Sequence, residues 1–207
     1  VLAALPSVKT SFMLGFADEA ADTGPLTGTE RLDTALARHQ DATTPTFKRL
    51  NFNAPMVIMF SSGTTGKPKC IEHGQGGVLL KQLTEHILHN NTRPDDCTFF
   101  FTTCGWMMWN WLITGLQTGA TVMLYDGSPF APDPLVLWRF AEEHGITSMG
   151  LSAKYVDALN KQQVRPTTVG RFDDMRLIAS TTPPTPAPTM KAWAAERTLS
   201  SSSMMRP

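Results

Sequence analysis

Short apolar runs alternate with mixed apolar and polar stretches along residues 51–180, and this alternation predicts the secondary structure. The apolar runs predict strands at 55–60, 69–73, 97–103, 120–125, 146–151 and 175–180. The mixed stretches, together with the residues after Ser180, predict helices at 76–89, 106–117, 133–144, 153–162 and 188–197. Because most successive strands start about 25–30 residues apart, a spacing that suits right-handed strand–helix–strand crossovers, we expect an α/β fold. Its sheet is predicted to be mostly parallel, with helices on both faces.

The two ends of the chain carry weaker patterns. Residues 1–50 contain one candidate helix, at 29–38, introduced by Thr-Gly-Thr-Glu. The last residues, Ser200–Pro207, form a low-complexity run that predicts disorder.

The strand predicted at 55–60 runs directly into Ser-Ser-Gly-Thr-Thr-Gly-Lys-Pro-Lys at residues 61–69. Glycine lets backbone N–H groups approach an anion, hydroxyls add hydrogen-bond donors, and each lysine adds a positive charge. The spacing differs from a Walker A loop, because only two residues separate Gly63 from Gly66 and Pro68 follows Lys67. A polar surface turn is the alternative interpretation. The composition favours a nucleotide phosphate site formed by Ser61, Ser62, Gly63, Thr64, Thr65, Gly66, Lys67 and Lys69.

A cluster of tryptophan and methionine follows the strand predicted at 97–103. Trp106, Trp109 and Trp111 cannot all face one core stripe of a helix, so some of them are expected to line a pocket. A heavily buried helix at a domain interface is the alternative.

The segment 61–69 resembles the phosphate loop of the adenylate-forming enzymes, which include the acyl-CoA synthetases. Two more stretches are similar to the acetoacetate–CoA ligase family within this group. They are Thr-Thr-Cys-Gly-Trp-Met-Met-Trp-Asn-Trp at 102–111 and Leu-Tyr-Asp-Gly-Ser-Pro at 124–129. The resemblance extends from about Leu5 to Ser180 and is densest between Asn51 and Trp138.

This resemblance implies a chemistry and its co-substrates. The carboxylate of acetoacetate would attack the α-phosphorus of ATP, pyrophosphate would leave, and the thiol of coenzyme A would capture the acyl-adenylate. Mg²⁺ would be bound with the phosphates. The foremost candidates for phosphate contacts are Thr64, Thr65 and Lys69. The candidates for shaping the pocket of the short keto acid are Trp106, Met107 and Met108, with Asn110 as a hydrogen-bonding partner of its carbonyl group.

The resemblance also divides the chain. It implies a partial N-terminal segment at 1–50, a fragment of the adenylate-forming core at 51–180 and a divergent tail at 181–207. The family's adenine-binding segment, its ribose-binding aspartate and its C-terminal domain with a catalytic lysine have no counterpart in the sequence. We therefore assign no catalytic residue and expect an internal fragment that is catalytically incomplete on its own.

Composition argues against several other partners. The 18 Lys and Arg residues balance 18 Asp and Glu residues, so neither nucleic acid nor an anionic membrane is predicted as a partner. No apolar stretch reaches the roughly 18 residues that a membrane span needs. Three cysteines without Cys-x-x-Cys spacing argue against disulfides and zinc and favour the cytoplasm. The predicted partners are small molecules: ATP, acetoacetate and coenzyme A.

The histidines indicate no metal site. His86 and His89 lie three residues apart on the helix predicted at 76–89, without a third ligand nearby, and we interpret both as solvated. His73 precedes Gly74–Gly77, where the N-terminus of a helix could approach an anion. These glycines lack the full dinucleotide fingerprint.

No catalytic triad emerges. Neither Ser128 nor Ser152 lies in a Gly-x-Ser-x-Gly elbow, and the pair Asp95 and Asp96 is typical of a turn. Two other classes of function therefore stay open. One is a different nucleotide-using enzyme, such as a kinase or hydrolase, and the other is a non-catalytic interaction protein.

Overall fold

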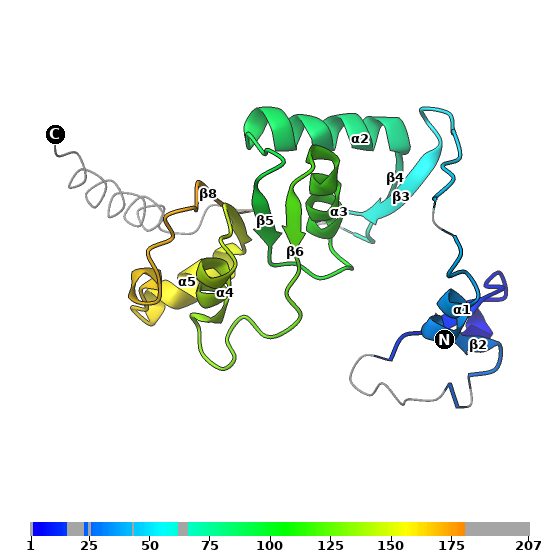
Figure 1. Cartoon of the computed structure of the whole chain (residues 1–207), viewed down its shortest axis with the longest axis horizontal. Helices are drawn as coiled ribbons and strands as arrows, with labels where there is room; N and C mark the ends of the chain where they lie inside the picture. The colour runs from blue at the N-terminus through cyan, green and yellow to red at the C-terminus, as the bar shows by residue number, and fades with distance from the viewer. Residues whose placement is uncertain (1, 16–22, 25, 43, 62–65, 181–207) are drawn as a thin grey trace. The chain divides into compact units, whose positions relative to one another are not determined.

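The structure is a computed structural model that describes residues 2–15, 23–24, 26–42, 44–61 and 66–180 (Figure 1). The chain divides into two compact units, Val1–Leu50 and Asn51–Pro207. The helix predicted at 188–197 and the low-complexity end of the chain lie outside the described residues.

The first unit contains a short parallel strand pair and one helix. Its elements are the 3-10 turn η1 (Leu2–Ala4), β1 (Ser11–Met13), β2 (Thr29–Arg31) and α1 (Leu32–Ala37). Ser11 lies opposite Thr29 in the pairing, and their hydroxyl oxygens are 2.6 Å apart. The helix predicted at 29–38 therefore begins only at Leu32, because its first three residues pair with β1 as a strand.

A parallel sheet of four strands lies at the centre of the second unit, in the order β6-β5-β7-β8. The strands are β5 (Cys97–Phe100), β6 (Thr121–Met123), β7 (Ser148–Leu151) and β8 (Leu177–Ser180). The helices between consecutive strands are α3 (Met107–Thr114), α4 (Val136–Glu143) and α5 (Ala153–Lys161), with 3-10 turns at Gly115–Thr118 (η3) and Pro166–Thr168 (η4). All pairings in this sheet are parallel, so the predicted α/β fold is confirmed.

Helices cover both faces of this sheet, as predicted. Successive side chains of a strand point to opposite faces. Accordingly, Phe99 of β5 joins the core beneath α4 and α5, whereas Phe100 packs with Met108 and Leu112 of α3. The larger core consists of Phe99, Leu137, Trp138, Ala141, Ile146, Met149, Leu151, Tyr155, Val156, Leu159, Phe172 and Met175. Burying each of its large aliphatic side chains contributes roughly 1.5–3 kcal/mol.

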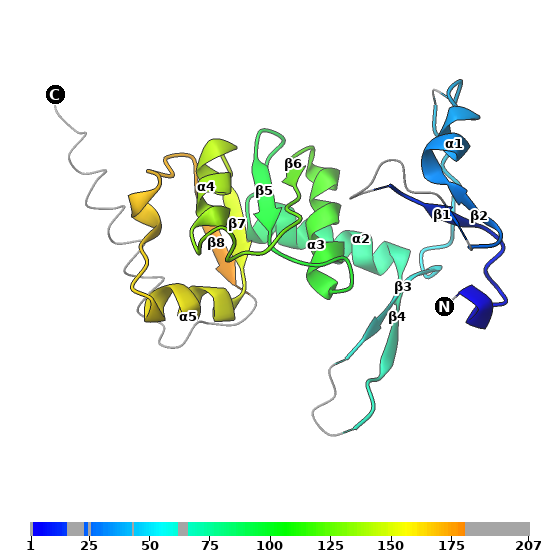
Figure 2. The ribbon, with the colours of Figure 1, turned by 90° about the horizontal axis from the view of Figure 1, so that it is seen from below.

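The strands predicted at 55–60 and 69–73 do not join the parallel sheet. They form β3 (Pro55–Phe60) and β4 (Cys70–Gly74), which pair with each other as a separate antiparallel hairpin (Figure 2). Only nine residues connect the two strands, and a parallel pairing needs a crossover of about a dozen residues or more. The prediction that β3 belongs to the main sheet is therefore wrong, although both strands form where the sequence indicated.

The helix predicted at 76–89 is present and has an irregular end. It consists of α2 (Gln75–Thr84) and a π-helical turn, η2 (Glu85–His89). The Asn90 N–H donates to the Glu85 carbonyl at 3.0 Å, which is the wider hydrogen bond of a π-turn. This helix packs against the hairpin, α3 and η3.

Candidate functional site

The strand order places a topological switch point between β5 and β7. After β5 the chain adds β6 on one side and then crosses to β7 on the other side. Ligands of open parallel sheets bind outside the carboxyl ends of the two strands at such a point. The segment Phe101–Trp106 follows β5 there, and Ser152 follows β7. Ser152 caps α5, because its hydroxyl accepts a hydrogen bond from the Tyr155 N–H at 3.2 Å.

Phe100 occupies the centre of the switch point. It lies opposite Gly150 in the strand pairing, and a Cβ atom added at Gly150 would be only 1.9 Å from Phe100 Cδ2. The Phe100 ring therefore covers the space that a side chain at position 150 would need. Two indoles pack against this ring in T-shaped arrangements, with centroid separations of 6.4 Å to Trp106 and 5.9 Å to Trp111.

The structure separates the predicted pocket residues. Trp106 and Met107 are 42% and 47% exposed, whereas Met108 is buried against Phe100 and Leu112. Met107 instead faces a cavity of about 190 Å³ on the other side of α3. That cavity is lined by Val57, Met59, His73, Gly77, Val78, Lys81, Gln82, Met107 and Asn110.

The predicted phosphate loop connects the two strands of the hairpin. Ser61 closes its base, because the Ser61 N–H donates to the Lys69 carbonyl at 3.0 Å and the Lys69 N–H donates to Ser61 Oγ at 3.3 Å. Gly66, Lys67 and Lys69 are exposed, and neither lysine forms an ion pair with any residue that the structure describes. Ser62, Gly63, Thr64 and Thr65 lie outside the described residues.

The N-terminus of α2 has fewer free N–H groups for an anion than the glycines at 74–77 suggested. The N–H groups of Gln75 and Gly76 donate to the carbonyls of Ala54 and Phe52, both at 2.9 Å. A Cβ atom at Gly76 would lie 2.3 Å from the Phe52 ring, so this glycine is explained by close packing. His73 is exposed beside this turn.

His86 is buried, which corrects its interpretation as a solvated residue. It is only 1% exposed; its Nε2 lies 2.9 Å from the Trp111 carbonyl, and its ring is 4.5 Å from the Trp111 ring. A carbonyl oxygen only accepts, so Nε2 carries the proton, while Nδ1 is buried without a partner among the described residues. Burial lowers the pKa of His86, against smaller opposing effects of the Trp111 hydrogen bond and the Glu85 charge. His89 is exposed and pairs with Glu85 at 2.9 Å.

Asp96 also differs from a solvated turn residue. It is 5% exposed, accepts a hydrogen bond from the Arg93 N–H at 2.8 Å and pairs with Arg176, the residue before β8. Burial alone would raise the pKa of Asp96, but the hydrogen bonds from Arg176 and Arg93 outweigh it and lower the pKa overall. Its neighbour Asp95 is exposed, as expected in a turn.

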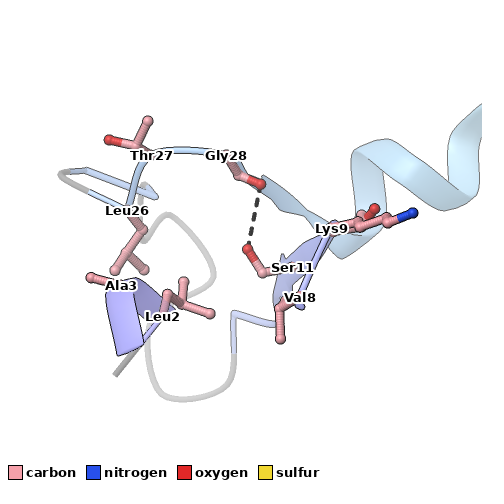
Figure 3. Close-up of a pocket in the computed structure, with 9 residues that line it drawn as sticks. Leu2, Ala3, Val8, Lys9, Ser11, Leu26, Thr27 and Gly28 are labelled. Carbon is pink, nitrogen blue, oxygen red and sulfur yellow. Dashed lines mark hydrogen bonds between the residues drawn. The ribbon is translucent and has the colours of Figure 1, made fainter. Parts of the chain in front are cut away.

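The first unit also contains a hollow. It measures about 650 Å³ and is lined by Leu2, Ala3, Val8, Lys9, Thr10, Ser11, Leu26, Thr27 and Gly28. Figure 3 shows the Lys9 amine directed away from Leu2 and Leu26, while the Ser11 hydroxyl donates to the Gly28 carbonyl at 3.4 Å. We therefore place the candidate site in the second unit.

Two further properties concern the described residues alone. Within them, no three His, Cys, Asp or Glu side chains lie close enough together to hold one metal ion. None of the helices in this part of the chain has the length and apolar character needed to cross a bilayer.

The sequence matches the family of AMP-binding enzymes over residues 5–200, so the chain belongs to this family. It is 40% identical to the acetoacetyl-CoA synthetase of Gallus gallus over 188 residues, which cover 89% of this chain and 28% of that protein. It is 36% identical to the malonamoyl-CoA synthetase vrtB of Penicillium aethiopicum over 203 residues, covering 89% of this chain and 28% of that protein.

The fold is similar to that of a solved acetoacetyl-CoA synthetase from Streptomyces lividans, with a TM-score of 0.83 and 35% identity. The match covers 96% of this chain and 30% of that one. The chain thus spans less than a third of the length of each of these relatives. The resemblance of the sequence to adenylate-forming acyl-CoA synthetases is confirmed.

Proposed function

We propose that this chain supplies the ATP phosphate loop and part of the acid pocket of an ATP-dependent acid–thiol ligase. The ligase activates a short acid as its acyl-adenylate and transfers the acyl group to coenzyme A, releasing pyrophosphate and AMP. The observation that carries this proposal is the segment 61–69, rich in donors and joining β3 to β4 in a member of the AMP-binding enzyme family.

The loop residues act by neutralising and positioning charge. As pyrophosphate leaves, negative charge grows on its oxygens, so donors already in place stabilise the transition state more than the bound substrate. The ammonium groups of Lys67 and Lys69 are free of competing ion pairs among the described residues, which suits this role. The full set assigned to the phosphates is Ser61, Ser62, Gly63, Thr64, Thr65, Gly66, Lys67 and Lys69.

Magnesium would enter with ATP as part of the substrate. Mg²⁺ in nucleotide sites is held largely by phosphate oxygens and water, with few protein ligands.

The acid is best supported as acetoacetate or a close analogue. The relatives are named for acetoacetyl and malonamoyl groups, and the corresponding acids share a carbonyl group β to the carboxylate. We propose that the substrate class of this chain is the short β-carbonyl acids, with the exposed Trp106 and Met107 at their site and Met108 supporting it from the core. A simple short-chain acid is the second candidate.

Nucleotide binding by the Lys69→Ala variant tests the proposal. Loss of one charge-assisted contact is expected to weaken ATP binding by about 1.5–3 kcal/mol, or about 10- to 150-fold. Lys161→Ala, an exposed lysine at the end of α5, is the control and should leave the affinity unchanged. Equal affinity of wild type and Lys69→Ala by calorimetry would remove Lys69 from the site.

A second assay separates the three classes of function. Acetoacetate-dependent exchange of labelled pyrophosphate into ATP is expected of the ligase. Phosphate release without acetoacetate would instead indicate a hydrolase. If the wild-type chain binds no nucleotide, the result would favour an interaction protein.

A further inference from the structure

A series of aromatic contacts links the buried His86 to the exposed Trp106 at the switch point. We propose that His86 is a positioning residue, which fixes Trp111 and, through Phe100, sets the orientation of the Trp106 indole. The consequence for acid binding rests on the proposed function, because Trp106 is assigned there to the site of the acid.

The first contact holds the end of α3. Helix α3 lies against α2 (Figure 1), and the Nε2–H of His86 donates to the Trp111 carbonyl, in the last turn of α3, at 2.9 Å. In a continuing α-helix the Gly115 N–H would reach this carbonyl, but it donates to carbonyls nearer to it in the chain. The Thr114 hydroxyl donates to the same oxygen at 2.7 Å. His86 therefore caps α3 from a neighbouring helix.

The same histidine also packs against the Trp111 side chain. The imidazole and the indole lie 4.5 Å apart, from ring centre to ring centre, and their planes are inclined by 31°. His86 is 1% exposed, so its ring cannot turn away without leaving a buried carbonyl short of a donor. One side chain thus fixes both the backbone and the indole of Trp111.

The π-turn η2 anchors the backbone that carries the imidazole. Such turns are rare and occur mostly as single turns within α-helices, frequently at functional sites. The His86 carbonyl accepts the N–H of Thr92 at 2.8 Å, and Thr92 is itself buried. The chain after the helix therefore holds His86 in place, as a positioning role requires.

The next two contacts pass through Phe100. Its ring meets Trp111 at 5.9 Å and Trp106 at 6.4 Å, both in T-shaped arrangements. Phe100 is 3% exposed, with Met108 packed against it and no space for even a Cβ atom between its ring and Gly150. Close-packed interiors transmit displacements, because they contain few voids that could absorb them. A shift of Trp111 is therefore passed on to Trp106.

The phosphate loop lies outside this series of contacts. The orientation of an exposed indole decides how much apolar surface it offers to a ligand. Trp106 is 42% exposed, so a displaced indole costs the acid a contact. Binding of ATP phosphates by the segment 61–69 does not depend on that indole. We therefore expect His86 to affect acid binding and to leave ATP binding unchanged.

NMR of the indole N–H groups in the ¹⁵N-labelled chain tests the positioning role without any ligand. Trp106→Phe identifies the Trp106 signal. In His86→Leu, which removes both the ring and the donor, this signal is expected to shift by more than its line width. His86→Gln should shift it less, because its amide can still donate to the Trp111 carbonyl. Should His86→Leu fail to fold, His86→Phe, which keeps a ring but lacks the donor, takes its place.

Two control variants exclude a general effect on the fold. His144→Leu removes an exposed histidine that packs against Phe140 at 4.7 Å, outside the series of contacts. Ile146→Val lowers stability by trimming a buried core side chain. Both should leave the Trp106 signal in place.

A double-mutant comparison tests the route through Phe100. In a Phe100→Leu background the ring between the two indoles is missing, so His86→Leu should no longer move the Trp106 signal. The same shift with and without the Phe100 ring would overturn the inference. So would an unmoved Trp106 signal in His86→Leu, or an equal shift in either control variant.

Titration with acetoacetate and with ATP tests the consequence for binding. His86→Leu should weaken acetoacetate binding by about 2- to 12-fold, comparable to the loss of one hydrogen bond, at unchanged ATP affinity. An equal loss of affinity for both ligands would indicate a merely structural role and overturn the inference.

The outcomes also distinguish the two proposals. If Lys69→Ala weakens ATP binding but His86→Leu leaves the Trp106 signal unmoved, only the role of His86 fails. If the Trp106 signal responds as expected but wild type binds neither acetoacetate nor ATP, the ligase proposal fails while the positioning of Trp106 by His86 holds.

Discussion

Substituting alanine for Gly150 tests the central packing of the candidate site. The new Cβ atom would lie 1.9, 2.4 and 2.5 Å from three carbons of the Phe100 ring, far inside van der Waals contact. Phe100 is 3% exposed, so its ring cannot swing into solvent to relieve the clash. Overpacking of a core costs about 1–3 kcal/mol, and three close contacts point to the upper end of this range. Alanine in a strand recovers about 0.5–1 kcal/mol relative to glycine, which leaves an expected net loss of about 2 kcal/mol.

Urea unfolding followed by tryptophan fluorescence measures this loss. Gly77→Ala in α2 is the matched control, because nothing lies within 4 Å of its added Cβ atom, and it should raise stability by about 0.5–1 kcal/mol. In a Phe100→Leu background the smaller side chain leaves room, so the penalty of Gly150→Ala should largely disappear. A Gly150→Ala protein as stable as wild type, or a penalty unaffected by Phe100→Leu, would refute the packing argument.

Two further predictions concern pH. The folded pKa of His86 lies below its ordinary value of 6.5. The contribution of neutral His86 to the free energy of unfolding is therefore full above pH 6.5. It falls as the pH drops towards the folded pKa, by at most about 1.4 kcal/mol per pH unit. His86→Gln should flatten this part of the curve of unfolding free energy against pH, and an unchanged curve would contradict the assignment. The folded pKa of Asp96 is also lowered, so its contribution is present above its ordinary value of 3.8 and is lost as the pH falls through the folded pKa. Asp96→Asn should cost about 1–3 kcal/mol at pH 7 and progressively less in acid, whereas a constant difference between variant and wild type would exclude the charge as the cause.

Much of the second unit could be predicted because its elements are strongly patterned. The run at 97–103 is apolar and rich in phenylalanine, and β5 forms within it, although the strand already ends at Phe100. The helix predicted at 153–162 corresponds to α5, whose buried Tyr155, Val156 and Leu159 occupy one helical face. The spacing of apolar positions shows which face of an element is buried, and that spacing differs between a helix and a strand.

The fate of individual polar residues was harder to predict. His86 lies on the face of the helix that meets α3, and the polar Gln82 one turn before it gave no sign in the sequence that this face is buried. Histidine suits both a buried and a solvated position, and only the neighbouring carbonyl of Trp111 decides between them. Asp96 likewise depends on Arg176, which lies 80 positions further along the chain.

The amino-acid sequence by itself determined the succession of strands and helices, the donor-rich composition of the loop at 61–69 and the family. These depend on local periodicity and on residue types at short spacing. Tertiary structure alone decided that β3 pairs with β4 rather than with the main sheet, that Met107 and Met108 face different surroundings, and that Asn110 borders a cavity. The physical reason is that pairing and burial depend on surfaces brought together from distant parts of the chain, and local patterns do not specify which surfaces meet.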